Sequence, residues 1–101
     1  MILNVLIEAY KQGELILVDG GFCRWHLLKN RQITIYEIFS MRQGAGSEML
    51  EILKKKQADS IFAKCPVNYP SNEWYRKKEF HLEEVQKDRK GNELCCWRLT
   101  L

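Results

Sequence analysis

The chain has 101 residues, enough for one domain (1–101) with a single modest hydrophobic core. Apolar residues make up 46% and charged residues 29% of it, a globular composition that argues against intrinsic disorder. The net charge of +3 suits an anionic ligand, but it is too small to indicate nucleic-acid binding by itself.

The first predicted element is a helix over Ile2–Tyr10, where apolar residues recur at helical spacing, and Gly13 is suited to end it. This N-terminal stretch has no basic segment before its apolar residues and no small-residue cleavage site, so it does not match a signal peptide. No apolar run in the sequence is long enough to span a bilayer. We therefore expect a cytoplasmic protein that makes no membrane contact.

Three strands should follow and form an antiparallel meander. The strands are expected over Glu14–Val18, Phe22–Leu28 and Gln32–Ser40, the last of them rich in β-branched and aromatic residues. The sequence "DGG" at Asp19 to Gly21 is a strong signal for a tight turn between the first two strands.

A helix is predicted after Gly46 from the spacing of its apolar residues, and an apolar strand follows it over Ser60–Val67. This strand–helix–strand crossover predicts that Gln32–Ser40 and Ser60–Val67 run parallel. The remaining elements are a helix over Pro70–Phe80 and two strands, His81–Gln86 and Glu93–Leu101. The sequence thus predicts an α/β fold with a mixed sheet and the element order α-β-β-β-α-β-α-β-β.

The four cysteines form no C-x-x-C pair, and only two histidines are present. A zinc site would therefore lack its usual ligand spacing. We expect the cysteines to be reduced, buried small hydrophobic residues, and we expect no metal site.

Two glycines, Gly44 and Gly46, stand in "RQGAGS" at the predicted strand-to-helix junction. Glycine adopts backbone angles closed to other residues and lets a ligand approach the chain. Backbone amides that converge before a helix, together with the helix dipole, can hold a phosphate, and Arg42 would add a charge at the rim. The alternative is a tight turn in which the glycines only relieve strain. The lysine and the Ser/Thr of a nucleotide-hydrolysing phosphate loop are missing.

The stretch "MRQGAG" resembles the R/Q-x-x-G-x-G/A signature of the GNAT superfamily, the Gcn5-related N-acetyltransferases, except at Met41. The stretch "NYPSNEWYRKKEF" resembles the second motif of that family, with Glu79 in place of the usual glycine before Phe80. The resemblance covers about Ile33 to Leu101. It implies a small GNAT-like fold whose shortened N-terminal part leaves the acceptor pocket open or completed by a second subunit.

The resemblance further implies an acyl-CoA-dependent N-acyltransferase, in which acetyl-CoA lies between the two parallel strands. An amine of a protein or small molecule would attack the thioester directly, and Tyr75 would protonate the departing thiolate. The implied cofactor-binding residues are Ile38, Phe39, Ser40, Met41, Arg42, Gln43, Gly44, Ala45, Gly46, Ser47, Asn68 and Asn72. Alternatively, Tyr75 is a core aromatic residue, and Asn68 and Asn72 are cap or turn residues.

Glu37 is the candidate general base. It shares a strand face with Ile33, Ile35 and Phe39 if no bulge intervenes, and a buried carboxylate there would suit proton abstraction. The alternative is a carboxylate at the end of the sheet that is solvated or paired with Arg24 or Arg42.

Two other functions stay open. The chain could be a cofactor-binding or protein-interaction module that has the fold without turnover. It could also be a small nucleic-acid-binding protein acting through Lys54–Lys56 and Arg76–Lys78, although these runs are better explained as solvated helix faces. We also expect Glu93–Leu101 to be an exposed sheet edge, which could pair with a copy of itself in a homodimer.

Overall fold

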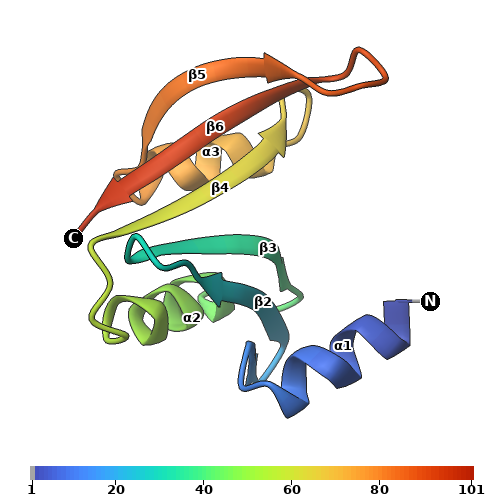
Figure 1. The fold of residues 1–101 in the computed structure, drawn as a ribbon, viewed down its shortest axis with the longest axis vertical. Coiled ribbons are helices and arrows are strands. Elements are labelled where there is room, and N and C mark those ends of the chain that lie inside the picture. Colours follow the sequence, from blue (N-terminus) through green and yellow to red (C-terminus); the bar gives the residue numbers. More distant parts are fainter. Residues whose placement is uncertain (1) are drawn as a thin grey trace.

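The computed structural model describes residues 2–101, and its elements follow the predicted order (Figure 1). They are α1 (Ile2–Lys11), β1 (Leu15–Val18), β2 (Gly21–Leu27), β3 (Gln32–Ser40), α2 (Ala45–Lys54), β4 (Ser60–Pro66), α3 (Ser71–Lys77), β5 (His81–Lys87) and β6 (Glu93–Thr100). None of the helices in this described range is long and apolar enough to cross a membrane.

The strands form one six-stranded sheet in the order β1-β2-β3-β4-β6-β5. β3 and β4 are parallel and every other neighbouring pair is antiparallel, so the predicted meander and crossover are confirmed. The expectation that Glu93–Leu101 is an exposed edge was wrong, because β6 lies between β4 and β5. The reason is burial: β6 carries the core residue Trp97, only 1% exposed, whereas the charged strand β5 is exposed along nearly its whole length.

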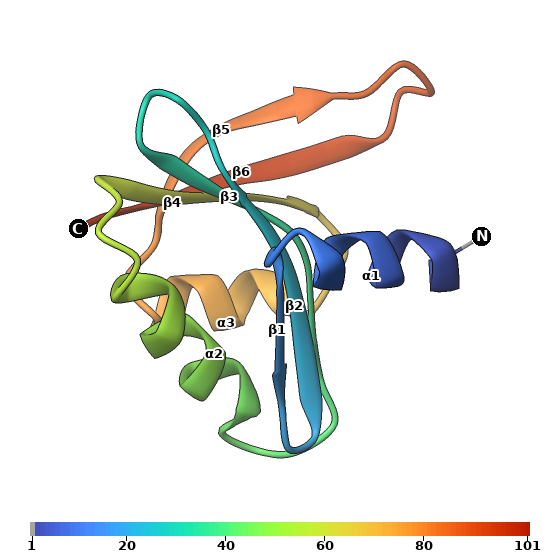
Figure 2. The same ribbon diagram turned by 60° about the horizontal axis from the view of Figure 1, so that its bottom comes forward.

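Helices cover both faces of the sheet unequally. Figure 2 shows α2 and α3 on one face and α1 on the other. The main core lies under α2 and α3, where Met49, Leu50 and Leu53 pack against Ile33 and Ile61. Among the described side chains of α1 Ala9 is buried and Leu6 is half-buried, whereas four other apolar residues are exposed, namely Leu3, Val5, Ile7 and Tyr10.

The centre of the sheet opens into a wedge. β3 and β4 are paired only from Gln32–Ser60 to Ile35–Ala63, and beyond that point the two strands diverge (Figure 1). A β-bulge lies at the same level, because Arg24 is opposite Glu37 while Trp25 is opposite Ile35, which leaves Tyr36 as an extra residue in β3. Bulges bend a strand and increase its local twist, which accounts for the divergence. Residues 36–40 therefore present a strand edge that β4 does not cover.

Candidate active site

A cavity of about 560 Å³ lies beside this wedge, between the end of β3, the loop after it and the first turns of α2 and α3. Nine residues assigned to the site from the sequence line it: Ile38, Phe39, Ser40, Arg42, Gln43, Gly44, Gly46, Ser47 and Tyr75. Pro70, Ser71 and Trp74, which the sequence did not single out for this site, also line it. The cavity thus joins a free strand edge, a helix N-terminus and a phenol.

The loop from Met41 to Gly44 leads directly into α2. Gly44 is the residue before the helix and has a φ of 91°, a left-handed conformation that strongly favours glycine. The amides of Gly46 and Ser47 lie in the first turn, where no intrahelical acceptor is available, so they can donate to a ligand. With the positive end of the helix dipole they can hold an anion.

Gly46 is glycine for a different reason from the one expected. It belongs to α2 rather than to the turn, and an added Cβ would lie 3.1 Å from Cζ2 of Trp74. The space above Gly46 is therefore occupied by the indole of α3, which packs directly on the helix backbone. The two glycines serve separate purposes: Gly44 permits a left-handed turn, and Gly46 permits close packing between helices.

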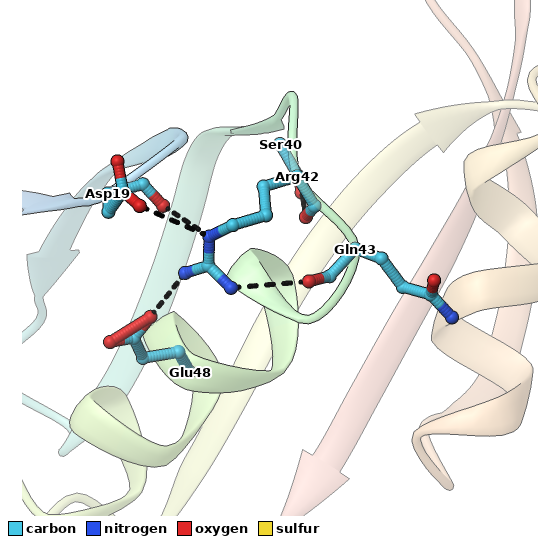
Figure 3. Close-up of polar contacts among 5 residues, drawn as sticks. All are labelled: Asp19, Ser40, Arg42, Gln43 and Glu48. Atoms are coloured by element: carbon cyan, nitrogen blue, oxygen red, sulfur yellow. Dashed lines mark hydrogen bonds and ion pairs between the residues drawn. The ribbon is translucent and has the colours of Figure 1, made fainter.

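Arg42 lies at the rim of the cavity, but its guanidinium group is already engaged (Figure 3). Its Nε donates to the carbonyl oxygen of Asp19 at 3.0 Å, and its Nη2 donates to Oε2 of Glu48 at 2.8 Å. Its Nη1 donates to the carbonyl oxygen of Gln43 at 3.2 Å. The free positive charge expected at the rim is therefore balanced by neighbouring acceptors.

Tyr75 is both a core residue and a cavity residue. Its ring is 4% exposed, stacks on Trp97 with centroids 6.1 Å apart, and meets Phe80 edge-on at 5.1 Å. Burial raises the pKa of Tyr75 well above that of a free phenol, and the neighbouring thiols of Cys65 and Cys23 contribute in the same direction. The phenol is therefore neutral at physiological pH and can act as a proton donor.

The sequence matches no protein-family model and no curated protein. The structure, however, is similar to solved acetyltransferases. For one assigned to the GNAT family from Desulfovibrio desulfuricans, the TM-score is 0.67 at 18% identity, covering 80% of this chain and 60% of that one. For the Bacillus subtilis acetyltransferase in complex with CoA, the TM-score is 0.73 at 16% identity, and the match covers 97% of this chain and 83% of that one. This chain has the GNAT fold.

The ribosomal-protein-S18-alanine N-acetyltransferase from Escherichia coli is also similar, with a TM-score of 0.65 and 16% identity, covering 80% of this chain and 61% of that one. The chain thus spans about three fifths of the length of the Desulfovibrio and E. coli proteins. At these identities the likeness establishes the GNAT fold alone.

Within the GNAT fold, Glu37 lies away from the cavity. The bulge at Tyr36 reverses the alternation of β3, so Glu37 is on the face that α1 covers, whereas Ile38 lines the cavity. The expected face for Glu37 was therefore wrong. Its Oε1 accepts from Nη2 of Arg24 at 2.8 Å, which confirms the alternative of an ion pair with Arg24.

Four other residues assigned to the cofactor site lie outside the cavity lining. Met41 is 76% exposed and Ala45 is fully buried, and neither lines the cavity. Asn68 is exposed on the loop before α3. Asn72 is buried and holds that loop, donating to the carbonyl oxygens of Pro66 and Tyr69 at 2.8 and 2.9 Å.

No cluster of three or more His, Cys, Asp or Glu side chains that could hold a metal ion is present in residues 2–101. All four cysteines are free and buried.

Proposed function

We propose that this protein binds acetyl-CoA in the wedge between β3 and β4 and transfers the acetyl group to a primary amine. The observation that supports the proposal is the cavity, where the start of α2 lies at one end of an unpaired strand edge with the phenol of Tyr75 beside it. The GNAT fold supports the same assignment, since one similar structure was solved in complex with CoA.

The residues of the cavity fit the parts of the cofactor. The amides around Gly44, Gly46 and Ser47 would hold the diphosphate at the N-terminus of α2. The unpaired edge of β3 at Ile38–Ser40 would offer backbone groups to the amides of the pantetheine arm, as a neighbouring strand would. The cofactor would supply an activated thioester, and the residues of the cavity would hold that thioester in place.

Tyr75 would protonate the leaving thiolate. As the amine nitrogen bonds to the carbonyl carbon and the carbon–sulfur bond breaks, the sulfur gains a negative charge that a neutral phenol can quench. Burial raises the pKa of Tyr75, so the phenol is protonated before this step but is also a weaker acid than a free phenol, and the transfer would depend on the charge developing on the adjacent sulfur.

The acceptor amine would approach from the α1 face, because the cofactor would fill the α2 and α3 side of the wedge. Glu37 projects onto the α1 face from the bulged part of β3, and we propose it as the base that takes the ammonium proton. Its ion pair with Arg24 must open, or be shared with the acceptor, for that transfer.

A second candidate is a GNAT-fold module that binds the cofactor without turnover. Two observations favour it: no carboxylate or histidine lines the cavity, and Glu37 is paired with Arg24. Without a free base, a protonated amine would not become a nucleophile at neutral pH.

Calorimetric titration with acetyl-CoA, followed by a thiol-release assay with a panel of amines, tests both candidates. Saturable binding with thiol release that depends on the amine supports the acyltransferase. Acetyl-CoA binding without thiol release with any of the amines supports the second candidate. No binding at millimolar acetyl-CoA contradicts both candidates.

A further inference from the structure

Two carboxylates flank the loop that would hold the diphosphate. Glu48 is in the first turn of α2, and Asp19 is in the turn between β1 and β2. The side chain of Glu48 is 51% exposed and that of Asp19 is 97% exposed. A bound diphosphate would be repelled by both unless a cation is paired with them.

Arg42 provides that cation. Its Nη2 is 2.8 Å from Oε2 of Glu48 and its Nε is 3.7 Å from Oδ2 of Asp19, so one guanidinium group bridges both carboxylates (Figure 3). We propose that Arg42 is a positioning residue that screens these carboxylates and anchors the phosphate loop to the β1–β2 turn, without itself contacting the phosphate. This inference rests on the proposed function.

The anchoring is visible in the backbone around Arg42. The amide of Met41 donates to the carbonyl oxygen of Gly20 at 2.7 Å, and the hydroxyl of Ser40 donates to the carbonyl oxygen of Arg42 at 2.8 Å. The β1–β2 turn lies so close to the loop after β3 that a Cβ on Gly20 would lie 2.7 Å from Cβ of Arg42. The loop is thereby held in place before a ligand arrives, which lowers the ordering cost of binding.

The screening should affect ligand affinity more than folding. Pairs this exposed add little to stability, because water already screens them and holding the side chains costs entropy. Beside a diphosphate, however, loss of Arg42 would leave two carboxylates facing the anion. If Arg42 acts by screening, most of the effect of its loss on CoA affinity should depend on the negative charge of Glu48.

The test uses calorimetric titration with CoA, and with pantetheine as a ligand that lacks the diphosphate, at low and high salt. Arg42→Ala should weaken CoA binding by about tenfold at low salt and less at high salt, with pantetheine binding unchanged. Adding Glu48→Gln to Arg42→Ala should recover most of the loss, while Glu48→Gln alone should leave binding equal or slightly tighter. Thermal melting of each variant checks that the fold is kept.

An Arg42→Ala loss of CoA affinity that Glu48→Gln fails to recover would overturn the screening role. Equal CoA binding by Arg42→Ala and the wild type would also overturn it while leaving the proposed function standing. A wild-type protein that binds no CoA would overturn both.

Discussion

The side-chain oxygen of Asn72 accepts a hydrogen bond from the indole nitrogen of Trp97 at 2.8 Å, and both residues are buried. This bond joins the start of α3 to β6, the strand that lies between β4 and the edge strand β5. The amide nitrogen of Asn72 also donates to Pro66 and Tyr69, so one side chain fixes the loop that leads into α3. The position of Tyr75 therefore depends on Asn72 through the helix they share.

Asn72→Ala should destabilise the protein by about 2–4 kcal/mol, because it removes several hydrogen bonds and leaves the buried indole nitrogen of Trp97 without an acceptor. Asn68→Ala, at an exposed site on the same loop, is the matched control and should change stability by less than about 0.5 kcal/mol. Urea unfolding of both variants measures the difference, and equal midpoints would contradict this role for Asn72.

Tyr75→Phe should lower the turnover number by about a hundredfold while leaving the affinity for CoA within about twofold of the wild type. The change removes only the hydroxyl that would protonate the thiolate, and the ring keeps its contacts with Trp97 and Phe80. Steady-state kinetics and calorimetry measure the two quantities separately. Unchanged turnover would show that the thiolate obtains its proton elsewhere.

Gly46→Val should destabilise the protein by about 1–3 kcal/mol, since even a Cβ would lie 3.1 Å from the indole of Trp74. The cost should shrink in a Trp74→Ala background, where the opposing ring is gone. Gly44→Ala is the control: its strain comes from a φ of 91° and should be independent of Trp74. A thermal-denaturation mutant cycle measures the coupling, and its absence would contradict the packing explanation.

Glu79→Gly should stabilise the protein by about 0.5–1 kcal/mol. Glu79 has a φ of 70°, which costs a residue with a Cβ more than it costs glycine. Lys78, its neighbour, has a φ of −85°, so Lys78→Gly should instead destabilise by a similar amount. Chemical denaturation measures both changes, and we expect the two adjacent substitutions to change the free energy of unfolding in opposite directions.

The free energy of unfolding should fall as the pH rises above 9, partly through Cys23. Burial, with a smaller contribution from Glu37, raises the pKa of this thiol from 9.0 to about 12. Between these values the unfolded thiol ionises while the folded one stays protonated, so unfolding is favoured by up to about 1.4 kcal/mol per pH unit. Below about pH 8 the thiol is protonated in both states and contributes almost no pH dependence.

Cys23→Ala should therefore reduce the slope of stability against pH between 9 and about 11, even though it lowers stability at pH 7. Denaturant unfolding at several pH values gives both slopes. Parallel slopes for the variant and the wild type would assign the alkaline loss to other groups, such as Tyr75.

The sequence was informative wherever structure depends on neighbours along the chain. Apolar spacing together with turn residues and Pro70 predicted every helix and strand, and Gln32–Ser40 was predicted with its observed bounds. The crossover predicted parallel pairing of β3 and β4 correctly, because a helix between two strands of one sheet leaves little other choice. The turn glycine Gly20 was likewise readable from "DGG", since its φ of 79° is a local requirement.

Several features of the site were not readable, because each depends on residues far apart in the sequence. The face of Glu37 follows from how β3 pairs with β2, where one extra residue reverses the alternation. The partner of Arg42, Asp19, is 23 positions away, and the packing partner of Gly46 is on another helix. Helical spacing in α1 likewise predicted a helix without indicating that most of its apolar side chains stay exposed.

Periodicity and turn residues thus specified the elements and their order, since hydrogen bonding and apolar burial act over a few residues at a time. The wedge, the filled space above Gly46 and the balanced charge of Arg42 arose from side chains that meet only after the sheet and helices assemble. That assembly decides whether Gly46 or Arg42 contacts a ligand or a neighbouring side chain, because close packing leaves room at each position for only one of these two partners.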